Sequence, residues 1–134
     1  MDSNEIKSLI QSYLNAYNSF DVDGILQLLH NNIEFRNISN GVVGVETKGI
    51  EEFRELAEQS KKIFSHRLQT INNYSITDDK VEVEINFEGT LGTELPNGLK
   101  AGETIILKGK TLFKVKDKKL LLIEDYSWGI WKSK

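Results

Sequence analysis

A single carboxylate near the end of the chain, Asp125, lies in a mostly apolar segment. Residues 119–131 have the composition of a β-strand, and side chains alternate between the two faces of a strand. Asp125 therefore shares one face with Leu121 and Ile123. A carboxyl group among such neighbours has a raised pKa, which suits a general acid or base near neutral pH.

Two other interpretations of Asp125 stay open. It could be a structural carboxylate that pairs with Arg36, Arg67 or a backbone N–H group, since structural ion pairs shift pKa values too. A one-residue slip of the strand would instead turn Asp125 outwards and bring Glu124 or Tyr126 into the pocket.

Four further side chains could bind or polarise a ligand. Tyr13, on a predicted helix, could donate a hydrogen bond into a cavity or simply pack its ring on a sheet, and Tyr17, one turn later, has the same two roles. Asn37 could orient a carbonyl group or be satisfied by nearby backbone. His66 could act as a base near neutral pH or lie in solvent without a role.

Other kinds of site find no support in the sequence. There are no cysteines, and the two histidines lie far apart without metal-ligand spacing. No G-x-S-x-G motif occurs, and the glycines at 41, 44 and 49 lack the lysine and hydroxyl residue of a phosphate-binding loop. We therefore expect no metal and no cofactor.

Length and charge narrow the class of protein. The 134 residues fit one domain, 1–134. With 17 basic and 20 acidic residues the net charge is −3, which argues against a nucleic-acid partner. No apolar run is long enough to cross a membrane, and the first residues lack the pattern of a signal peptide, so we expect a cytoplasmic protein.

The periodicity of apolar residues predicts three helices followed by a run of strands. The helices are expected at 3–20, from Asp21 or Asp23 to the Asn31-Asn32 pair, and at 49–64. The strands are expected at 33–38, 42–45, 66–77, 81–89, 103–115 and 119–131. This order is typical of an α+β fold, in which a curved antiparallel sheet wraps around the helices to form a cone with an internal pocket. Gly109 interrupts one long strand, which predicts a bulge or a bend.

The face of residues 119–131 opposite Asp125 predicts a subunit interface. An exposed apolar patch usually marks an interaction surface, so we expect a homodimer through the outer sheet face. Charged neighbours such as Glu82, Glu84, Lys108 and Lys110 would either form pairs across that interface or favour a monomer. The patch residues are Leu120, Leu122, Tyr126 and Trp128.

The order of elements and four segments resemble a known group of proteins. The segments are YLNAYNSFDVDGILQLL, GIEEFRELAEQ, VEVEINFEGTL and KGKTLFKVKDKKLLLIEDYS. Together they resemble the SnoaL-like and ketosteroid-isomerase-like family of the nuclear transport factor 2-like superfamily over essentially the whole chain. The resemblance implies the cone fold and a small-molecule pocket, whereas activities within the family are diverse.

The resemblance also implies roles for single residues. Ketosteroid isomerases use a tyrosine eight residues before the aspartate of a D-x-D-G turn, and Tyr13 stands eight before Asp21. Their general base aligns with Asn37, which cannot accept a proton, and their second oxyanion donor aligns with Thr111 or its neighbour. Steroid isomerisation by that mechanism is therefore not expected. SnoaL-like cyclases use a pocket carboxylate, for which Asp125 is the candidate.

Three functions follow as hypotheses. The first is cofactor-free acid/base chemistry on a small apolar carbonyl compound, in which Asp125 moves a proton while Tyr13 and Asn37 hold the oxygen. The second is a binding module that only stores or senses such a ligand. The third is a protein-interaction domain that uses its outer sheet face. The other residues expected around the ligand are Tyr17, Phe35, Phe53, His66, Ile85, Phe87, Thr111, Phe113 and Ile123.

Overall fold

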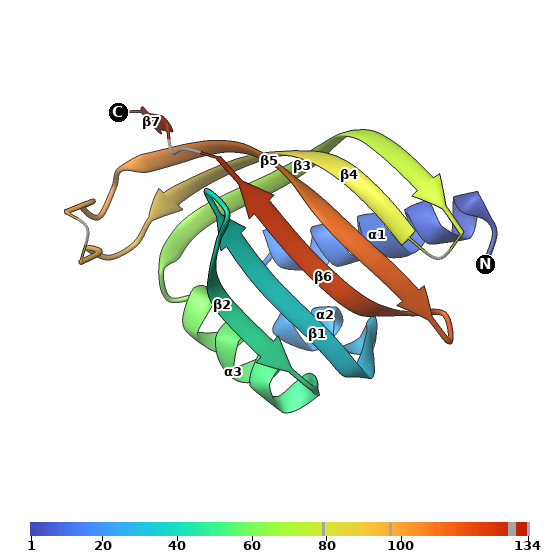
Figure 1. Cartoon of the computed structure of the whole chain (residues 1–134). Helices are drawn as coiled ribbons and strands as arrows, with labels where there is room; N and C mark the ends of the chain where they lie inside the picture. Colours follow the sequence, from blue (N-terminus) through green and yellow to red (C-terminus); the bar gives the residue numbers. More distant parts are fainter. Residues whose placement is uncertain (79, 97, 129–130, 134) are drawn as a thin grey trace.

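One curved β-sheet carries the helices on its concave face (Figure 1). The computed structural model describes residues 1–78, 80–96, 98–128 and 131–133. The helices are α1 (Ser3–Asn18), α2 (Val22–Gln27) and α3 (Ile50–Ser60). The strands are β1 (Leu29–Ser39), β2 (Val42–Lys48), β3 (Phe64–Thr77), β4 (Lys80–Leu91), β5 (Thr104–Lys116), β6 (Lys119–Ser127) and β7 (Trp131–Ser133). The α+β class predicted from the sequence is confirmed.

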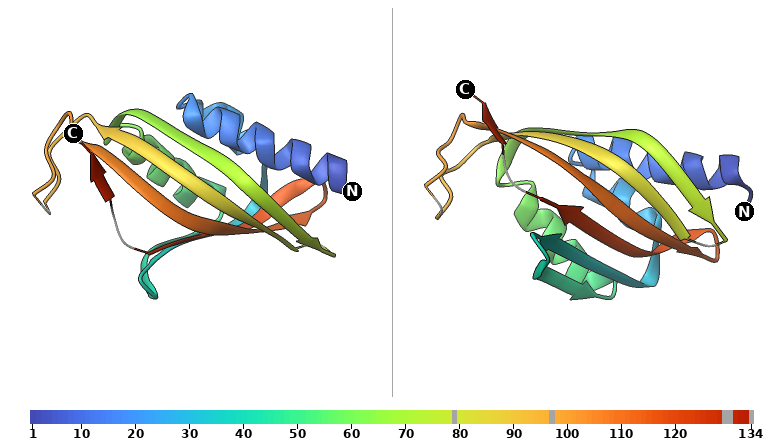
Figure 2. Two further views of the ribbon diagram at one scale, coloured as in Figure 1. Left: turned by 90° about the horizontal axis from the view of Figure 1, so that it is seen from above. Right: turned by 45° about the horizontal axis from the view of Figure 1, so that its top comes forward.

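The sheet is open and mixed in direction. Its strands follow the order β2-β1-β6-β5-β4-β3, and β7 pairs with β5. All pairs are antiparallel except β1 with β6, whereas we expected antiparallel pairing throughout. The parallel pair arises because β6, which follows β3, β4 and β5 in the sequence, lies between β1 and β5 in the sheet (Figure 2).

Helix α1 packs one apolar stripe against the sheet. Its buried residues Ile6, Ile10, Tyr13 and Leu14 recur at helical spacing. Asp2 caps its start, because the Asp2 carboxylate accepts a hydrogen bond from the backbone N–H of Glu5, and the Glu5 carboxylate accepts one from the backbone N–H of Asp2. Within the described residues, no helix is long and apolar enough to cross a membrane.

The C-terminal end of α1 is bonded to β3. The Asn18 amide donates to the carbonyl of Gln69 at 3.1 Å and accepts from its backbone N–H at 2.8 Å. Arg67 Nε donates to the Tyr17 carbonyl at 2.8 Å, and the backbone N–H of Phe20 donates to the same carbonyl at 3.2 Å. These contacts fix the position of α1 along the sheet.

All three predicted helices are shorter in the structure: the first ends at Asn18 rather than at residue 20, and the differences in the other two are larger. The second helix ends at Gln27 and β1 begins at Leu29, so the Asn31-Asn32 pair lies within the strand and does not end the helix. The third helix ends at Ser60, and Phe64 opens β3. In both places the apolar residues fit helix and strand equally well, and pairing with the sheet decides the outcome.

A bulge in β6 changes which of its residues face inward. Lys114 pairs with Leu122 and Val115 with Leu120, so Leu121 is the extra residue. As a result Leu120 and Ile123 both belong to the core, and the expectation that Leu120 lies on the outer face is wrong. The strand ends at Ser127 rather than continuing to residue 131, and residues 129 and 130 lie outside the described part of the chain.

Gly109 brings two strands close together without a bulge. The pairing of β5 with β4 runs through Gly109 in unbroken register, so the predicted bulge is absent there. A Cβ atom at this position would overlap the backbone carbonyl oxygen of Tyr126. Glycine is therefore required by the close approach of β5 and β6.

Charged side chains on the outer face pair within the chain. Arg36 contacts Glu34, Glu46 and Glu124, at 3.2, 2.6 and 2.8 Å. Lys110 contacts Glu82 at 2.6 Å. Trp128 is 54% exposed and its ring stacks on that of Tyr126. The homodimer through this face stays a prediction.

The bonds between Asn18 and Gln69 lead to a stability prediction. Asn18→Ala removes both of them and leaves backbone groups of β3 half-buried without partners, so we expect it to lower the free energy of unfolding by about 1–3 kcal/mol. Asn15→Ala, at an exposed position of the same helix, should change it by less than about 0.5 kcal/mol. Urea unfolding followed by circular dichroism measures both, and equal effects of the two substitutions would contradict the role given to Asn18.

Candidate functional site

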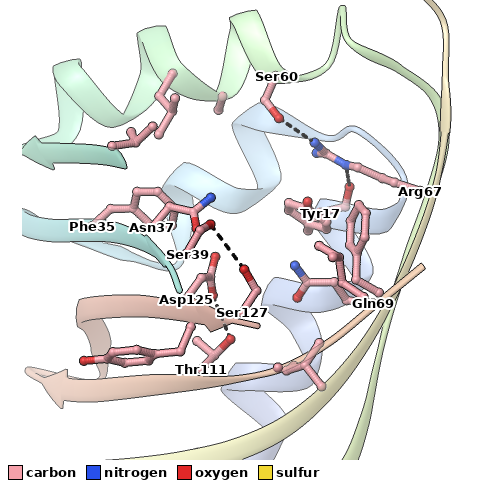
Figure 3. Close-up of a pocket in the computed structure, with 18 of the residues that line it drawn as sticks. Tyr17, Phe35, Asn37, Ser39, Ser60, Arg67, Gln69, Thr111, Asp125 and Ser127 are labelled. Atoms are coloured by element: carbon pink, nitrogen blue, oxygen red, sulfur yellow. Dashed lines mark hydrogen bonds between the residues drawn. The ribbon is translucent and has the colours of Figure 1, made fainter. Parts of the chain in front are cut away.

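A cavity of about 390 Å³ opens between the concave face of the sheet and the three helices. This size suits a small organic molecule. Its walls are largely apolar, with polar groups gathered on the strands and at the end of α1 (Figure 3). Nine of the predicted site residues line it, namely Tyr13, Tyr17, Phe35, Asn37, Phe53, Ile85, Phe87, Thr111 and Asp125.

Three predicted site residues lie elsewhere. His66 is exposed, because the pairing of β3 with β4 shifts between Phe64 and His66 and turns this side chain away from the cavity. Phe113 and Ile123 pair across β5 and β6 and are completely buried in the core. The edge of the Phe113 ring packs against Tyr13, so both residues support the cavity from below rather than line it.

Asp125 projects from β6 into the cavity between two polar neighbours (Figure 3). Asn37 of β1 pairs with it on one side and Thr111 of β5 on the other. The Thr111 hydroxyl donates a hydrogen bond to Asp125 Oδ1 at 2.7 Å. Burial raises the pKa of Asp125 from 3.8 to about 6, although this hydrogen bond lowers it. The group can therefore exchange a proton near neutral pH.

The ion pairs considered for Asp125 do not form. Arg36 points to the outer face, where it binds Glu34, Glu46 and Glu124. Arg67 bonds to Tyr17 and to Ser60. The structural interpretation of Asp125 as the partner of an arginine is therefore wrong.

The polar side chains around Asp125 differ in their hydrogen bonding. The Thr111 hydroxyl donates its hydrogen bond to Asp125, so it is not free to donate to a ligand. The Asn37 amide has no hydrogen-bond partner among the described residues and is exposed to the cavity and solvent. Ser39 lies two residues after Asn37 on β1, and Ser127 lies two residues after Asp125 on β6. Their hydroxyl oxygens are 3.3 Å apart (Figure 3).

Two tyrosines of α1 form the opposite wall. Burial, the negative charge of Asp125 and the neighbouring Tyr17 raise the pKa of Tyr13 well above its ordinary value, although Arg67 lowers it. Burial likewise raises the pKa of Tyr17 to about 12, with Arg67 acting in the opposite direction. Both residues therefore stay protonated at neutral pH and are available as hydrogen-bond donors.

Arg67 is the main site residue that the sequence did not suggest as part of the pocket. It is 2% exposed, and its guanidinium lies 3.7 Å from the centre of the Tyr17 ring. Its Nη1 donates to Ser60 Oγ at 3.1 Å. Gln69, two residues further along β3, also lines the cavity. Strand alternation from Arg67 to Gln69 was the available signal, but arginine is usually exposed.

Among the described residues, no three His, Cys, Asp or Glu side chains gather in a way that could hold a metal ion. The chemistry that the cavity walls can offer is thus proton transfer at Asp125 and hydrogen bonding from tyrosine, asparagine and arginine.

The raised pKa of Asp125 predicts how stability depends on pH. The carboxyl titrates at about 6 in the folded protein and at 3.8 without burial, so its ionisation opposes folding. This cost is absent below pH 3.8, grows as the pH rises, and is complete above about 6, where it reaches at most about 3 kcal/mol. Asp125→Asn should therefore gain stability relative to the wild type as the pH rises from about 4 to about 6 and keep that gain at pH 8, as measured by urea unfolding, whereas parallel curves would show that Asp125 is not desolvated.

Comparison with known proteins supports the same fold. Residues 10–123 match the model of the SnoaL-like domain family. No curated protein matches the sequence closely enough to count as a relative.

Solved structures with this fold are distant in sequence. A candidate polyketide cyclase from Xanthomonas campestris is 20% identical, with a TM-score of 0.75 over 92% of this chain and 90% of its own. An LEH-like epoxide hydrolase from M. tuberculosis is 17% identical, with a TM-score of 0.74 over 92% and 83%. A candidate SnoaL-like polyketide cyclase from Jannaschia sp. is 13% identical, with a TM-score of 0.77 over 92% and 85%.

At such identities the structural likeness shows the fold alone, whereas the family match spans most of the sequence. The resemblance inferred from the sequence is confirmed, and the chain belongs to the SnoaL-like domain family.

Proposed function

We propose that the protein is a cofactor-free enzyme that transfers a proton on a small, largely apolar carbonyl compound bound in the cavity. The observation that carries the proposal is Asp125, a carboxyl group with a pKa of about 6 and one hydrogen-bond donor, Thr111, in an apolar pocket. Such a group is ionised enough to accept a proton and basic enough to hold it.

The reaction begins with loss of a proton beside the carbonyl group. The Asp125 carboxylate takes this proton, and the electron pair of the broken C–H bond moves towards the carbonyl oxygen to form an enolate. Tyr13 donates a hydrogen bond to that oxygen, and its raised pKa keeps the proton on the phenol. Asn37 assists from β1, where its amide is free to donate.

The fate of the enolate determines the reaction type. If protonated Asp125 returns its proton to a different carbon, the product is an isomer. If the enolate carbon attacks a second carbonyl group of the same molecule, a C–C bond forms while the π bond of that carbonyl breaks, and its oxygen takes the proton from protonated Asp125 to give a cyclic alcohol. Loss of a second proton from the carbon beside the remaining carbonyl and of hydroxide from the alcohol, together one water molecule, corresponds to a dehydratase. Among the solved structures with the same fold, two candidate polyketide cyclases and an LEH-like epoxide hydrolase are named for reactions on small organic molecules, which is consistent with a small-molecule enzyme.

Steroid isomerisation through an aspartate base on the first strand does not fit this site. Asn37 occupies the position that the family resemblance assigns to that base, and Thr111 occupies the position of the second oxyanion donor. Because Thr111 donates to Asp125, the proposed enzyme places its base on β6 instead.

A proton-exchange assay tests the function without knowledge of the natural substrate. The probe is 1-tetralone, a neutral bicyclic ketone, dissolved in D₂O with the protein, and NMR follows exchange of the protons next to its carbonyl group. We expect wild type to accelerate the exchange, with a rate that rises as the pH passes through about 6. Asp125→Asn should lower the catalysed rate by about a hundredfold or more.

Two variants serve as comparisons. Tyr13→Phe should slow the exchange by about tenfold to a hundredfold, because the enolate loses a donor. Asp117→Asn, a highly exposed carboxylate in the turn between β5 and β6, should leave it unchanged. If Asp125→Asn binds 1-tetralone and exchanges its protons as fast as wild type, the pocket is a binding module and the enzymatic proposal fails.

A further inference from the structure

We propose that the natural ligand carries a carboxylate group, which Arg67 binds at the end of the cavity away from Asp125. This inference rests on the proposed function of the same pocket and specifies the class of ligand: an apolar body with one anionic end. It comes from the contacts, burial and charge balance of Arg67.

Arg67 uses only part of its hydrogen-bonding capacity. Its Nε donates to the Tyr17 carbonyl and its Nη1 to Ser60 Oγ, and the Tyr17 hydroxyl interacts with the guanidinium as well. A guanidinium has five N–H donors, so two have no partner among the described residues. The residue is 2% exposed and is one of those that line the cavity, so a ligand bound there lies next to this guanidinium.

The charge of Arg67 also lacks a counterion. Each of the other two arginines of the chain contacts at least two carboxylates, Arg36 on the outer face and Arg54 on α3. Among the described residues no Asp or Glu pairs with Arg67. Burial lowers the pKa of Arg67, but arginine is not deprotonated in proteins. A buried and unpaired cation is costly, and an anionic ligand relieves that cost.

Aromatic rings hold the guanidinium in a fixed plane. The Tyr17 ring lies 3.7 Å from it and the Phe20 ring 4.5 Å. Phe20 adopts φ 58°, a left-handed conformation that is rare for a bulky residue, in the turn after α1. A guanidinium held between two rings loses little conformational freedom when a carboxylate binds its remaining N–H groups.

The spacing of the two charged groups suits one bound molecule. Asp125 and Arg67 each act on the pKa values of Tyr13 and Tyr17, so the tyrosines lie within reach of both. Figure 3 shows the Arg67 side chain in a different part of the cavity from Asp125, with Tyr17 on the Arg67 side. The ligand carboxylate would thus sit apart from the catalytic carboxylate, with its apolar body between them.

A matched pair of probes tests the proposal by isothermal titration calorimetry. The probes are 2-naphthoate and 2-naphthamide, which have nearly the same shape and differ in charge. At pH 7.5 we expect wild type to bind the carboxylate at least about tenfold more tightly than the amide. Equal binding of the two probes, or tighter binding of the amide, would overturn the proposal without any variant.

Substitutions then show whether Arg67 is the group responsible. Arg67→Gln should abolish the preference for 2-naphthoate, and Arg67→Lys, which keeps the charge near its place, should weaken it while leaving the carboxylate favoured. Arg36→Gln, a change of the arginine on the outer face, should leave the preference intact. Persistence of the full preference in Arg67→Gln would refute the assignment.

Each of the two proposals can be refuted without refuting the other. Asp125→Asn should keep the preference for 2-naphthoate even if it abolishes proton exchange, because Asp125 does not hold the carboxylate. The exchange assay uses neutral 1-tetralone, which has no carboxylate, so its result in the wild type does not depend on whether Arg67 binds one. A protein that exchanges protons but binds the amide as tightly as the carboxylate would retain the proposed function and lose only this inference.

Discussion

The hydrogen bonds between the C-terminal end of α1 and β3 are the constraint on which the cavity depends. The Asn18 side chain forms hydrogen bonds with both the backbone N–H and the carbonyl of Gln69, and Arg67 donates a hydrogen bond to the carbonyl of Tyr17. An amphipathic helix on an apolar sheet could otherwise slide or rotate with little change in buried area. Because its last turn is fixed, Tyr13 and Tyr17 project into the cavity from defined places, and the space opposite Asp125 stays open.

The electrostatics of the cavity follow from the same arrangement. Apolar walls disfavour charge, so they raise the pKa of Asp125 to about 6 and keep both tyrosines protonated. Arg67 cannot respond in this way because its proton does not leave at physiological pH. Among the groups that line the cavity, Asp125 has a charge that changes near neutral pH, whereas Arg67 keeps its charge.

Local sequence patterns predicted some of the site residues correctly, whereas errors arose where the direction of a side chain depends on long-range strand pairing. Alternation along the last long strand was enough to place Asp125 in the cavity, and the helical stripe was enough to place Tyr13. His66 and Leu120 were assigned to the wrong faces because bulges at their strands depend on partners that the sequence does not reveal. Arg67 was overlooked as a pocket residue because its burial arises only when α1 docks on β3.

The position of β6 in the sheet has a consequence for biogenesis. Strands β2 and β1 form one antiparallel unit and β3, β4 and β5 another, and β6 is the strand that joins them. A nascent chain can build both units as it emerges from the ribosome, but their strands join in one sheet only once the segment that carries Asp125 is released. Contacts so distant along the chain form slowly, so closure of the domain and completion of the site become the same late event.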